Sequence, residues 1–386
     1  MTNAVLSDAW VAVSERFSAA LHRMRTYDRP LLTIGGILIL LGILFSMATS
    51  PVATGRIHID EAFYFAARQA AYAAFGVMVM FTAAAFDART LRRAAVVLAA
   101  LMFPLCVLVS LLAPEVKGAS RWLDMGPISL QPSELLKPAL VVVWAWMLGE
   151  SMKGRGFPGR LISLGLYTIT AAALLSQPDI GQTALLGAVL GVMLILSGVA
   201  LRWVLGGGLG AIAAAFAIYR FYPHARERVD AFLHPEGDKH YQVARALDAI
   251  ASGGVFGRGP GEGIIKRSLP DAHADFVYAV AAEEFGLLAS LGVIAVFGAF
   301  AFRGLSRASR LNEPFEQLAA TGLVTLIVVQ ACIHIAVNLS LIPAKGMTLP
   351  FISFGGSSMI GSTLALGFCL SLLRDRPGAY LYAGQR

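Results

Sequence analysis

The stretch Ser268-Leu-Pro-Asp-Ala-His-Ala-Asp-Phe276 runs directly into Val277-Tyr-Ala-Val-Ala-Ala-Glu-Glu-Phe-Gly286. It joins the longest polar segment of the chain to the start of a long apolar run. Asp271 and Asp275 lie at this boundary, and a carboxylate at the mouth of a membrane helix is costly to desolvate. Position alone leaves two interpretations of Asp275, a general base or the N-cap of the helix that follows.

The composition around this boundary is that of an integral membrane protein. Of the 386 residues, 57% are hydrophobic and only 14% are charged, whereas soluble domains carry about 25% charged residues. Apolar runs of about 20 residues recur along the chain, which is the length that an α-helix needs to cross a bilayer. We therefore predict an all-α integral membrane protein and exclude an outer-membrane barrel, whose strands alternate in polarity.

Ten apolar runs predict ten transmembrane helices in a membrane domain that covers residues 31–376. The predicted helices span 31–49, 66–86, 94–112, 134–149, 161–176, 182–200, 203–219, 274–302, 318–341 and 355–373. A long polar loop, 220–272, separates the seventh helix from the eighth. Residues 1–30 have apolar side chains at helical spacing and predict an amphipathic surface helix, with a partly disordered tail as the alternative. Residues 377–386 form a short C-terminal tail.

The distribution of positive charge predicts the orientation. An even number of spans places both termini on one side, and 17 of the 31 Lys and Arg residues fall in the termini and the alternate loops on that side. Cytoplasmic loops are enriched in Lys and Arg, so both termini are predicted to be cytoplasmic. The net charge of +7 then needs no nucleic-acid partner. Four polar stretches share the predicted external face: 113–133, 177–179, 268–276 and 349–358.

The long external loop has a composition that suits a phosphate group. Its segment 252–263 is rich in glycine, and Arg228 is one of several cations in the same loop. Glycines expose backbone N–H groups, and cations beside such groups can hold a pyrophosphate. The alternative is a flexible turn beside the membrane.

Three charged residues mark the external ends of predicted helices. Glu134 and Lys137 are three residues apart, so they lie on one helix face. A lysine inside an apolar helix needs either an ion pair, here with Glu134, or an anionic ligand. Asp179 follows Pro178 at a tight break, and it either caps the sixth span or faces the same external cavity.

The stretch 338–358 is too irregular for a simple loop between two apolar runs. It contains two prolines, three glycines, Lys345 and several hydroxyl groups. Irregular backbone at membrane depth is tolerated where it is buried in protein or lines a wet cavity, so we expect a re-entrant wall of a polar site. Glu283 and Glu284 lie deeper in the eighth span, and we expect them to be buried structural acids with partners.

The sequence shows little that would hold a cofactor. The three cysteines lie in apolar runs without ligand spacing and are expected to be small core residues, and the seven histidines are scattered. We find no nucleotide-binding loop in the sequence. We therefore expect no organic cofactor, no metal held by the protein alone, and a substrate that arrives already activated.

Taken together, the polar motifs resemble those of the SEDS family, the FtsW/RodA membrane glycosyltransferases of bacterial cell-wall synthesis. The similarity rests on Arg121-Trp-Leu123, Gln131-Pro-Ser-Glu-Leu-Leu-Lys137, Gln177-Pro-Asp179, Tyr241-Gln242, Leu269-Pro-Asp-Ala-His-Ala-Asp-Phe276 and Leu349-Pro-Phe-Ile-Ser-Phe-Gly-Gly-Ser-Ser358. The last motif, with Lys345-Gly-Met-Thr348 before it, resembles the division branch, FtsW, more than the elongation branch, RodA. Ala274 and Phe354 stand where the family usually has Thr and often has Tyr, which removes two hydroxyl groups.

The resemblance implies that the chain polymerises lipid II, an undecaprenyl-pyrophosphate disaccharide-pentapeptide, into glycan strands at the outer face of the inner membrane during septal synthesis. It also implies that Asp275 is the catalytic acid, and a carboxylate at the external boundary suits the uptake of a proton from the attacking GlcNAc 4-hydroxyl. The predicted substrate site consists of Arg121, Glu134, Lys137, Asp179, Arg228, Gln242, Lys345, Ser357 and Ser358. Its cations would offset the charge of the leaving pyrophosphate, with Mg²⁺ or Mn²⁺ as a helper.

The resemblance further implies partners in the membrane. These are lipid II itself, membrane lipids, a class B penicillin-binding protein (an FtsI-like transpeptidase) and other membrane proteins of the divisome. Three alternative functions stay open: a RodA-like elongation polymerase, a flippase that moves lipid II, and a scaffold that recruits a transpeptidase. A flippase needs alternating access, and no internal repeat of the kind common in transporters is visible.

Overall fold

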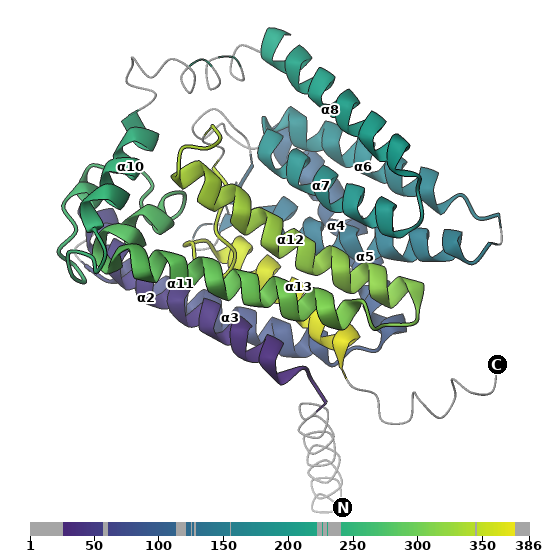
Figure 1. The fold of residues 1–386 in the computed structure, drawn as a ribbon, viewed down its shortest axis with the longest axis horizontal. Helices are drawn as coiled ribbons and strands as arrows, with labels where there is room; N and C mark the ends of the chain where they lie inside the picture. The colour runs from purple at the N-terminus through teal and green to yellow at the C-terminus, as the bar shows by residue number, and fades with distance from the viewer. Residues whose placement is uncertain are drawn as a thin grey trace, which may run out of the picture.

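The computed structural model describes residues 26–56, 61–112, 121–124, 126, 129–154, 156–221, 226, 230, 241–343 and 346–374. These residues form a helical bundle (Figure 1). Its helices are α2 (Arg29–Arg56), α3 (Tyr64–Ala84), α4 (Ala88–Leu112), α5 (Pro132–Met152), α6 (Gly159–Ser176), α7 (Ile180–Leu196), α8 (Leu201–Phe221), α10 (Tyr241–Gly253), the 3-10 helix η2 (Ile265–Arg267), α11 (Val277–Ala308), α12 (Pro314–Asn338) and α13 (Gly356–Leu373). Two short strands, β1 (Leu123–Asp124) and β2 (Ser129–Leu130), pair in antiparallel fashion.

Each of the ten predicted spans coincides with one of these helices. Eight helices among the described residues are long and apolar enough to cross a membrane, and α7 is a shorter apolar helix of 17 residues. The protein is therefore a multi-pass membrane protein, as its composition predicts. The helix α3 is in neither of these groups, so the number of ten transmembrane helices stays a prediction. The N-terminal segment lies outside the described residues up to residue 25, and so do the tail 377–386 and most of 222–240.

The helix α11 differs from the predicted eighth span in one respect. It is interrupted at Gly286, whose φ of +79° and ψ of −175° are not helical. The part after the break, 287–308, is long enough by itself to cross a bilayer, which takes about 20 residues. The part before the break, 277–285, directly follows the polar motif 268–276 and lies at the same end of the bundle as that motif.

The helix α13 runs through the centre of the bundle and is buried over almost its whole length. Figure 1 shows α12 and α13 crossing the middle, with α2 and α3 along one edge and α8 along the opposite edge. Small residues allow this close packing, because a side-chain carbon at Gly361 would lie 2.5 Å from the Glu134 carbonyl oxygen. A carbon at Gly367 would lie 2.5 Å from the Met80 carbonyl oxygen. Small residues at helix interfaces are typical of membrane bundles.

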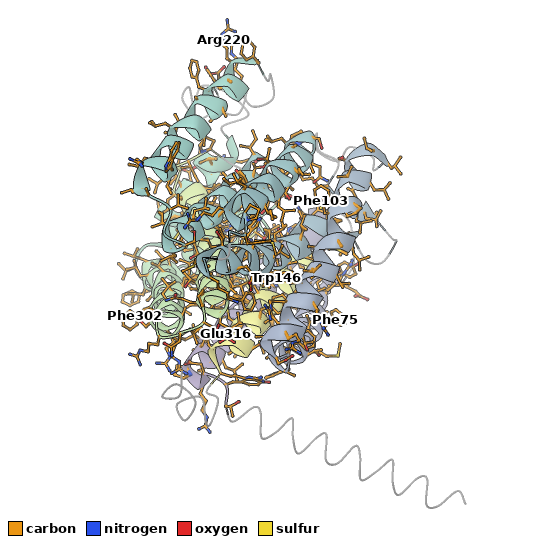
Figure 2. All side chains as sticks on the ribbon, turned by 90° about the vertical axis from the view of Figure 1, so that its right-hand side faces the viewer. Phe75, Phe103, Trp146, Arg220, Phe302 and Glu316 are labelled. Atoms are coloured by element: carbon orange, nitrogen blue, oxygen red, sulfur yellow. The ribbon has the colours of Figure 1, made fainter. Side chains whose placement is uncertain are left out.

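The outer surface of the bundle is apolar, as expected of a surface that faces lipid. Figure 2 shows Arg220 at the far end of α8, a helix that stands off from the others and is exposed along its length. Cys106 and Cys369 are buried as expected, but Cys332 is exposed. The expectation that Cys332 is a core residue is therefore wrong, because none of the described helices covers its face of α12.

An ion cluster closes one end of the bundle. Asp28, just before α2, accepts hydrogen bonds from Arg303 at 2.9 and 2.7 Å and lies 3.0 Å from Arg307. Arg307 also donates to the carbonyl of Leu373, the last residue of α13, at 3.2 Å. Because α11 and α13 both end here, the segments that precede them lie at the opposite end.

Candidate active site

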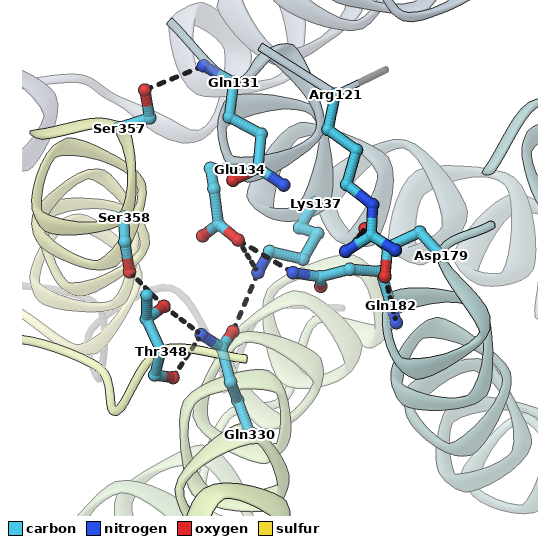
Figure 3. A network of polar contacts seen from close by, with 10 residues as sticks. All are labelled: Arg121, Gln131, Glu134, Lys137, Asp179, Gln182, Gln330, Thr348, Ser357 and Ser358. Carbon is cyan, nitrogen blue, oxygen red and sulfur yellow. Dashed lines mark hydrogen bonds and ion pairs between the residues drawn. The ribbon is translucent and has the colours of Figure 1, made fainter. Parts of the chain in front are cut away.

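Lys137 lies at the centre of a buried polar network at that opposite end (Figure 3). Its ammonium donates to Oε1 of Glu134 at 2.9 Å and to Oε1 of Gln330 at 2.8 Å. All three residues are only 3% exposed. An unpaired charge at such a position would be strongly destabilising. The ion pair expected from the three-residue spacing is present, and Gln330 is a second partner from a distant helix.

Asp179 has the capping role that the sequence left open, and its contact with an external cavity stays a prediction. It is the N-cap of α7, where its Oδ1 accepts the N–H of Gln182 at 3.3 Å. Its Oδ2 also lies 3.8 Å from Arg121 on the other side. Burial raises the pKa of the Asp179 carboxyl, while Arg121 and the Gln182 N–H oppose that rise. The side chain of Gln182 donates to Glu134 at 2.8 Å, which connects α7 to the network around Lys137.

Arg121 is held in place by backbone carbonyls. It donates to the carbonyl of Gln177 at 3.0 Å and to that of Pro178 at 2.6 Å. The residue comes shortly before the β1–β2 pair, and Gln131 comes directly after it. This small hairpin therefore ties Arg121 to the start of α5, where Glu134 and Lys137 lie.

The segment between α12 and α13 forms a polar wall opposite α5. Gln330 donates to the Thr348 carbonyl at 3.0 Å, and the hydroxyls of Thr348 and Ser358 share a hydrogen bond at 2.6 Å. Ser357 accepts the N–H of Gln131 at 2.9 Å, which ties the start of α13 to the start of α5. The expected polar wall is therefore present, and Ser357 and Ser358 are buried within it, while its re-entry into the membrane stays a prediction.

Asp275 lies in the turn before α11. The helix begins at Val277 with Phe276 as its N-cap, so the interpretation of Asp275 as the N-cap is wrong. The N–H groups of Ala274 and Asp275 both donate to the carbonyl of Asp271 at 3.0 Å, and Asp271 has a φ of +50°. This turn leaves Asp275 half-buried at the edge of the bundle.

The 346–348 segment connects Asp275 with the network around Lys137. A side-chain carbon at Gly346 would lie 3.6 Å from Oδ2 of Asp275. Thr348, two residues later, accepts the hydrogen bond from Gln330, which in turn holds Lys137. Two residues of extended chain span about 7 Å. The carboxylate and the buried network therefore border the same short segment and form one site.

The next residues of the wall hold the Asp275 turn from the other side. Ser353 donates its hydroxyl proton to the Ala274 carbonyl at 2.6 Å, and the N–H of Phe354 donates to the His273 carbonyl at 3.0 Å. Phe354 also packs edge-on against Phe65 of α3. The hydrogen bonds at Ala274 and Phe354 use backbone groups, so the two departures from the family pattern leave the junction intact.

Glu283 and Glu284 are buried structural acids, as expected. Glu284 pairs with the ammonium of Lys266 and accepts the N–H of Gly261 at 3.0 Å. Glu283 accepts three backbone N–H groups at 2.7 to 2.9 Å, those of Ile264, Ile265 and Lys266. The two acids thereby fasten the end of the long loop onto α11.

The glycines of segment 252–263 have a structural role that the sequence did not reveal. A side-chain carbon at Gly257 would lie 2.1 Å from the Glu284 carbonyl oxygen, and one at Gly253 would lie 2.0 Å from the Ala282 carbonyl oxygen. The glycines let the loop pack directly on the backbone of α11 near its break. The alternative of a flexible turn is therefore wrong for this part of the segment, and the hypothesis of a pyrophosphate loop stays a prediction.

Lys266→Met is expected to destabilise this fastening, because Glu284 would then keep a buried charge without its cation. Breaking a buried pair from one side typically costs about 3–5 kcal/mol. Thermal unfolding in detergent should show a lower midpoint, and hydrogen exchange should accelerate first in 257–267. The double variant Lys266→Met/Glu284→Gln should recover most of the loss. A single variant as stable as wild type would contradict this role.

Three predicted site residues are not among the contacts described above. Arg228 and Lys345 lie outside the described residues. Gln242 is exposed on α10 and is not among the side chains that the network joins. Sequence reasoning missed the side-chain roles of Gln182, Gln330, His334 and Asn338. Their one available signal was a polar side chain within or beside an apolar run, which is rare and functional in membrane helices.

The described residues do not form a metal cage of their own. No group of three or more His, Cys, Asp or Glu side chains is clustered among them in a way that could hold an ion. Mg²⁺ is usually held by one or two carboxylates together with substrate phosphates. The involvement of Mg²⁺ or Mn²⁺ therefore stays a prediction, and no step of the reaction below depends on it.

The fold and the site define a multi-pass helical membrane protein with a polar site at one end of its bundle. The chain belongs to the FtsW/RodA/SpoVE family of cell cycle proteins, whose family model matches residues 29–377. A protein of Caulobacter vibrioides named "Probable peptidoglycan glycosyltransferase FtsW" is 46% identical over 360 residues, which cover 93% of this chain and 92% of that protein. A protein of the same name from Geobacter sulfurreducens is 35% identical, and the match covers 92% of this chain and 96% of that protein.

Two solved structures share the fold. One is described as "Structural coordination of polymerization and crosslinking by a peptidoglycan synthase complex"; its matching chain has a TM-score of 0.75 and 28% identity, and the match covers 91% of this chain and 98% of that one. The other is the rod shape determining protein RodA of Thermus thermophilus, with a TM-score of 0.67, 26% identity and the same coverage. Both similarities extend over nearly the whole chain.

Proposed function

We propose that this chain is a peptidoglycan glycosyltransferase that polymerises lipid II into glycan strands. The observation that carries the proposal is the half-buried Asp275, which borders the same 346–348 segment as the buried network around Lys137. The relatives named as FtsW glycosyltransferases support the reaction class. Their name also favours the division branch, and hence septal synthesis, over the elongation branch.

The proposed orientation places this site at the outer face of the inner membrane. All ten predicted spans then cross the membrane, and both termini are cytoplasmic, as the Lys and Arg distribution predicts. The cluster of Asp28, Arg303 and Arg307 would lie at the cytoplasmic end. The site lies at the other end of α11 and α13, where a lipid-linked sugar can reach it from the outer leaflet.

The proposed reaction is a displacement at the anomeric carbon of the growing chain. The GlcNAc 4-hydroxyl of lipid II attacks that carbon, and the bond from it to the pyrophosphate oxygen breaks. Asp275 accepts the hydroxyl proton, and undecaprenyl pyrophosphate leaves with the bonding electron pair. A positioned general base typically contributes about 10²- to 10⁴-fold to the rate of such a step.

Two described cations support the departure of the pyrophosphate. Lys137 has three N–H donors, of which Glu134 and Gln330 receive two. Arg121 is oriented by the carbonyls of Gln177 and Pro178. Cations fixed in this way need no reorganisation when charge develops on the leaving group. Arg228 and Lys345 remain proposed members of the same set, together with Gln242 as a substrate contact.

The proposed partners follow from the relatives and the fold. The matching chain in the peptidoglycan synthase complex makes a transpeptidase of the class B penicillin-binding type the first expected partner. Other divisome membrane proteins and the surrounding lipids complete the expected setting. A scaffold role and catalysis are compatible, because the partner can bind the outer surface while the site stays free.

The polymerase and flippase functions can be separated in liposomes that contain the purified protein and its transpeptidase. Labelled lipid II is supplied, polymer is measured on gels, and movement between leaflets is measured by quenching of a headgroup label. We expect glycan polymer from substrate in the outer-equivalent leaflet. Movement between leaflets without any polymer would instead favour the flippase.

A further inference from the structure

Three polar side chains form a stripe on the buried face of α12. Gln330, His334 and Asn338 are spaced four residues apart, so they lie one above another on one helix face. Each is at most 3% exposed. Polar residues inside an apolar helix are expected to have partners. The stripe therefore marks the face of α12 that holds other parts of the site.

The three members of the stripe hold two backbone segments. Gln330 holds the Thr348 carbonyl, and Nδ1 of His334 lies 2.7 Å from the Met347 carbonyl, so that nitrogen carries the proton. Asn338 reaches the other wall, where its amide donates to the Asp275 carbonyl at 3.1 Å. One helix thus connects the wall beside Lys137 with the turn that carries Asp275.

Asn338 also satisfies the start of α11 from a different helix. Its Oδ1 accepts the N–H of Ala279 at 3.1 Å. Ala279 is the third residue of α11, so its N–H has no partner within the helix. The N-cap residue, Phe276, provides no side-chain hydrogen bond. Asn338, on a different helix, therefore accepts a first-turn N–H group of α11 that an N-cap side chain would normally accept.

The orientation of the Asn338 amide is fixed by its neighbours. Its nitrogen faces two carbonyls, those of Asp275 at 3.1 Å and His334 at 2.9 Å, and its oxygen faces the N–H of Ala279. A reversed amide would place an oxygen against two carbonyl oxygens. Both N–H donors of the amide are used, and Asn338 is fully buried.

We propose that Asn338 is a positioning residue that fixes Asp275 relative to Lys137. The inference rests on the proposed function, in which Asp275 takes the proton of the attacking hydroxyl. Gln330 and Asn338 are eight residues apart on one helix, about 12 Å at about 1.5 Å per residue. This rigid spacing sets the distance between the base and the cation that faces the leaving group. A displacement of about 1 Å at such a site can cost about 10²-fold in rate.

The test uses the full chain in liposomes with its transpeptidase and lipid II as the substrate. Asn338→Leu keeps the size and removes every side-chain hydrogen bond, while Asn338→Asp keeps the acceptor for Ala279 and removes the donor to Asp275. We expect kcat per folded complex to fall about 10- to 100-fold in both. The value of KM should stay within about threefold, because Asn338 is placed to hold the base and not the substrate.

Hydrogen exchange provides a readout that does not depend on activity. Peptides covering 271–280 should exchange faster in both variants, while peptides of α13 should exchange as in wild type. Ser371→Ala is the matched control, because it removes a partly buried hydrogen bond of 2.7 Å to the Phe86 carbonyl at the other end of the bundle. This control should leave kcat and the exchange of 271–280 unchanged.

Two results would overturn the proposal. One is a kcat per folded complex like that of wild type, which would make Asn338 a structural residue only. The other is a raised KM with unchanged kcat, which would make it a substrate contact. If Asn338→Leu does not fold, Asn338→Asp decides alone, and a wild-type kcat there rejects the proposal. The proposed function fails separately, if Asp275→Asn retains full activity, and the positioning proposal then fails with it.

Discussion

Asp275→Asn is expected to abolish lipid II polymerisation, with a fall in kcat of about 10²- to 10⁴-fold. The amide has the size and shape of the carboxyl group but cannot take the proton of the attacking hydroxyl. The fold should be unaffected, because backbone groups of residues 273–275 make the hydrogen bonds that hold this turn. The measurement is polymer formed per minute by the variant in complex with its transpeptidase, together with the thermal midpoint of the complex.

Asp271→Asn is the matched control for this prediction. The residue lies four positions earlier in the same turn, and its φ of +50° is tolerated by asparagine as well as by aspartate. We expect it to keep most of the wild-type rate. An equal loss in both variants would show that the negative charge of the turn matters as a whole, and it would contradict a specific role for Asp275.

Lys137→Met is expected to have a large effect on both stability and activity. Glu134 would keep a buried negative charge without its cation, and the hydrogen bond from the Gln182 amide, at 2.8 Å, would not compensate for that loss. The expected loss in the free energy of unfolding is about 3–5 kcal/mol. Polymerisation should be lost as well, since the cation proposed to face the leaving pyrophosphate is removed. The thermal midpoint measures the loss of stability, and the polymerisation rate per folded protein measures the loss of activity.

A double variant separates these two effects. In Lys137→Met/Glu134→Gln the buried charge is gone, and the new amide at position 134 can still accept the hydrogen bond from Gln182. We expect the thermal midpoint to return toward wild type while polymerisation stays absent. Recovery of both would show that the ion pair is only structural, and it would remove Lys137 from the substrate site.

The positions of the helices along the chain could be predicted from the sequence because they depend on local properties. Apolar runs of sufficient length give the helices, and their charged ends give the boundaries to within a few residues at most of them. The start of α5 at Pro132 and the cap of α7 at Asp179 follow from the same local rules. The break at Gly286 does not, because it depends on contact with the loop around Gly257.

The candidate site could be predicted only in part. The Glu134–Lys137 pair was visible because both residues lie on one helix turn. Its third member, Gln330, is 193 positions away in sequence from Lys137, and no spacing rule connects them. Asn338 stood at the edge of a motif, but its contact with the Asp275 carbonyl depends on how α11 and α12 pack.

The glycine-rich segment shows why composition can mislead. Exposed N–H groups in such a loop suit a phosphate, yet here the Glu284 carboxylate takes that of Gly261, and the backbone carbonyls of Glu283 and Glu284 take those of Arg258 and Gly259. Both acids are visible in the sequence, but their distance from the loop is not. A buried carboxylate in a neighbouring helix competes with any anionic ligand for the same N–H groups.

The most direct test of the central claim is to count glycosidic bonds formed and undecaprenyl pyrophosphate released by the reconstituted complex. Wild-type protein and Asp275→Asn are measured side by side on the same lipid II. One bond per pyrophosphate released is predicted for wild type, and neither product is predicted for the variant. Equal amounts of polymer from both proteins would contradict the assignment of Asp275 as the base that drives the reaction.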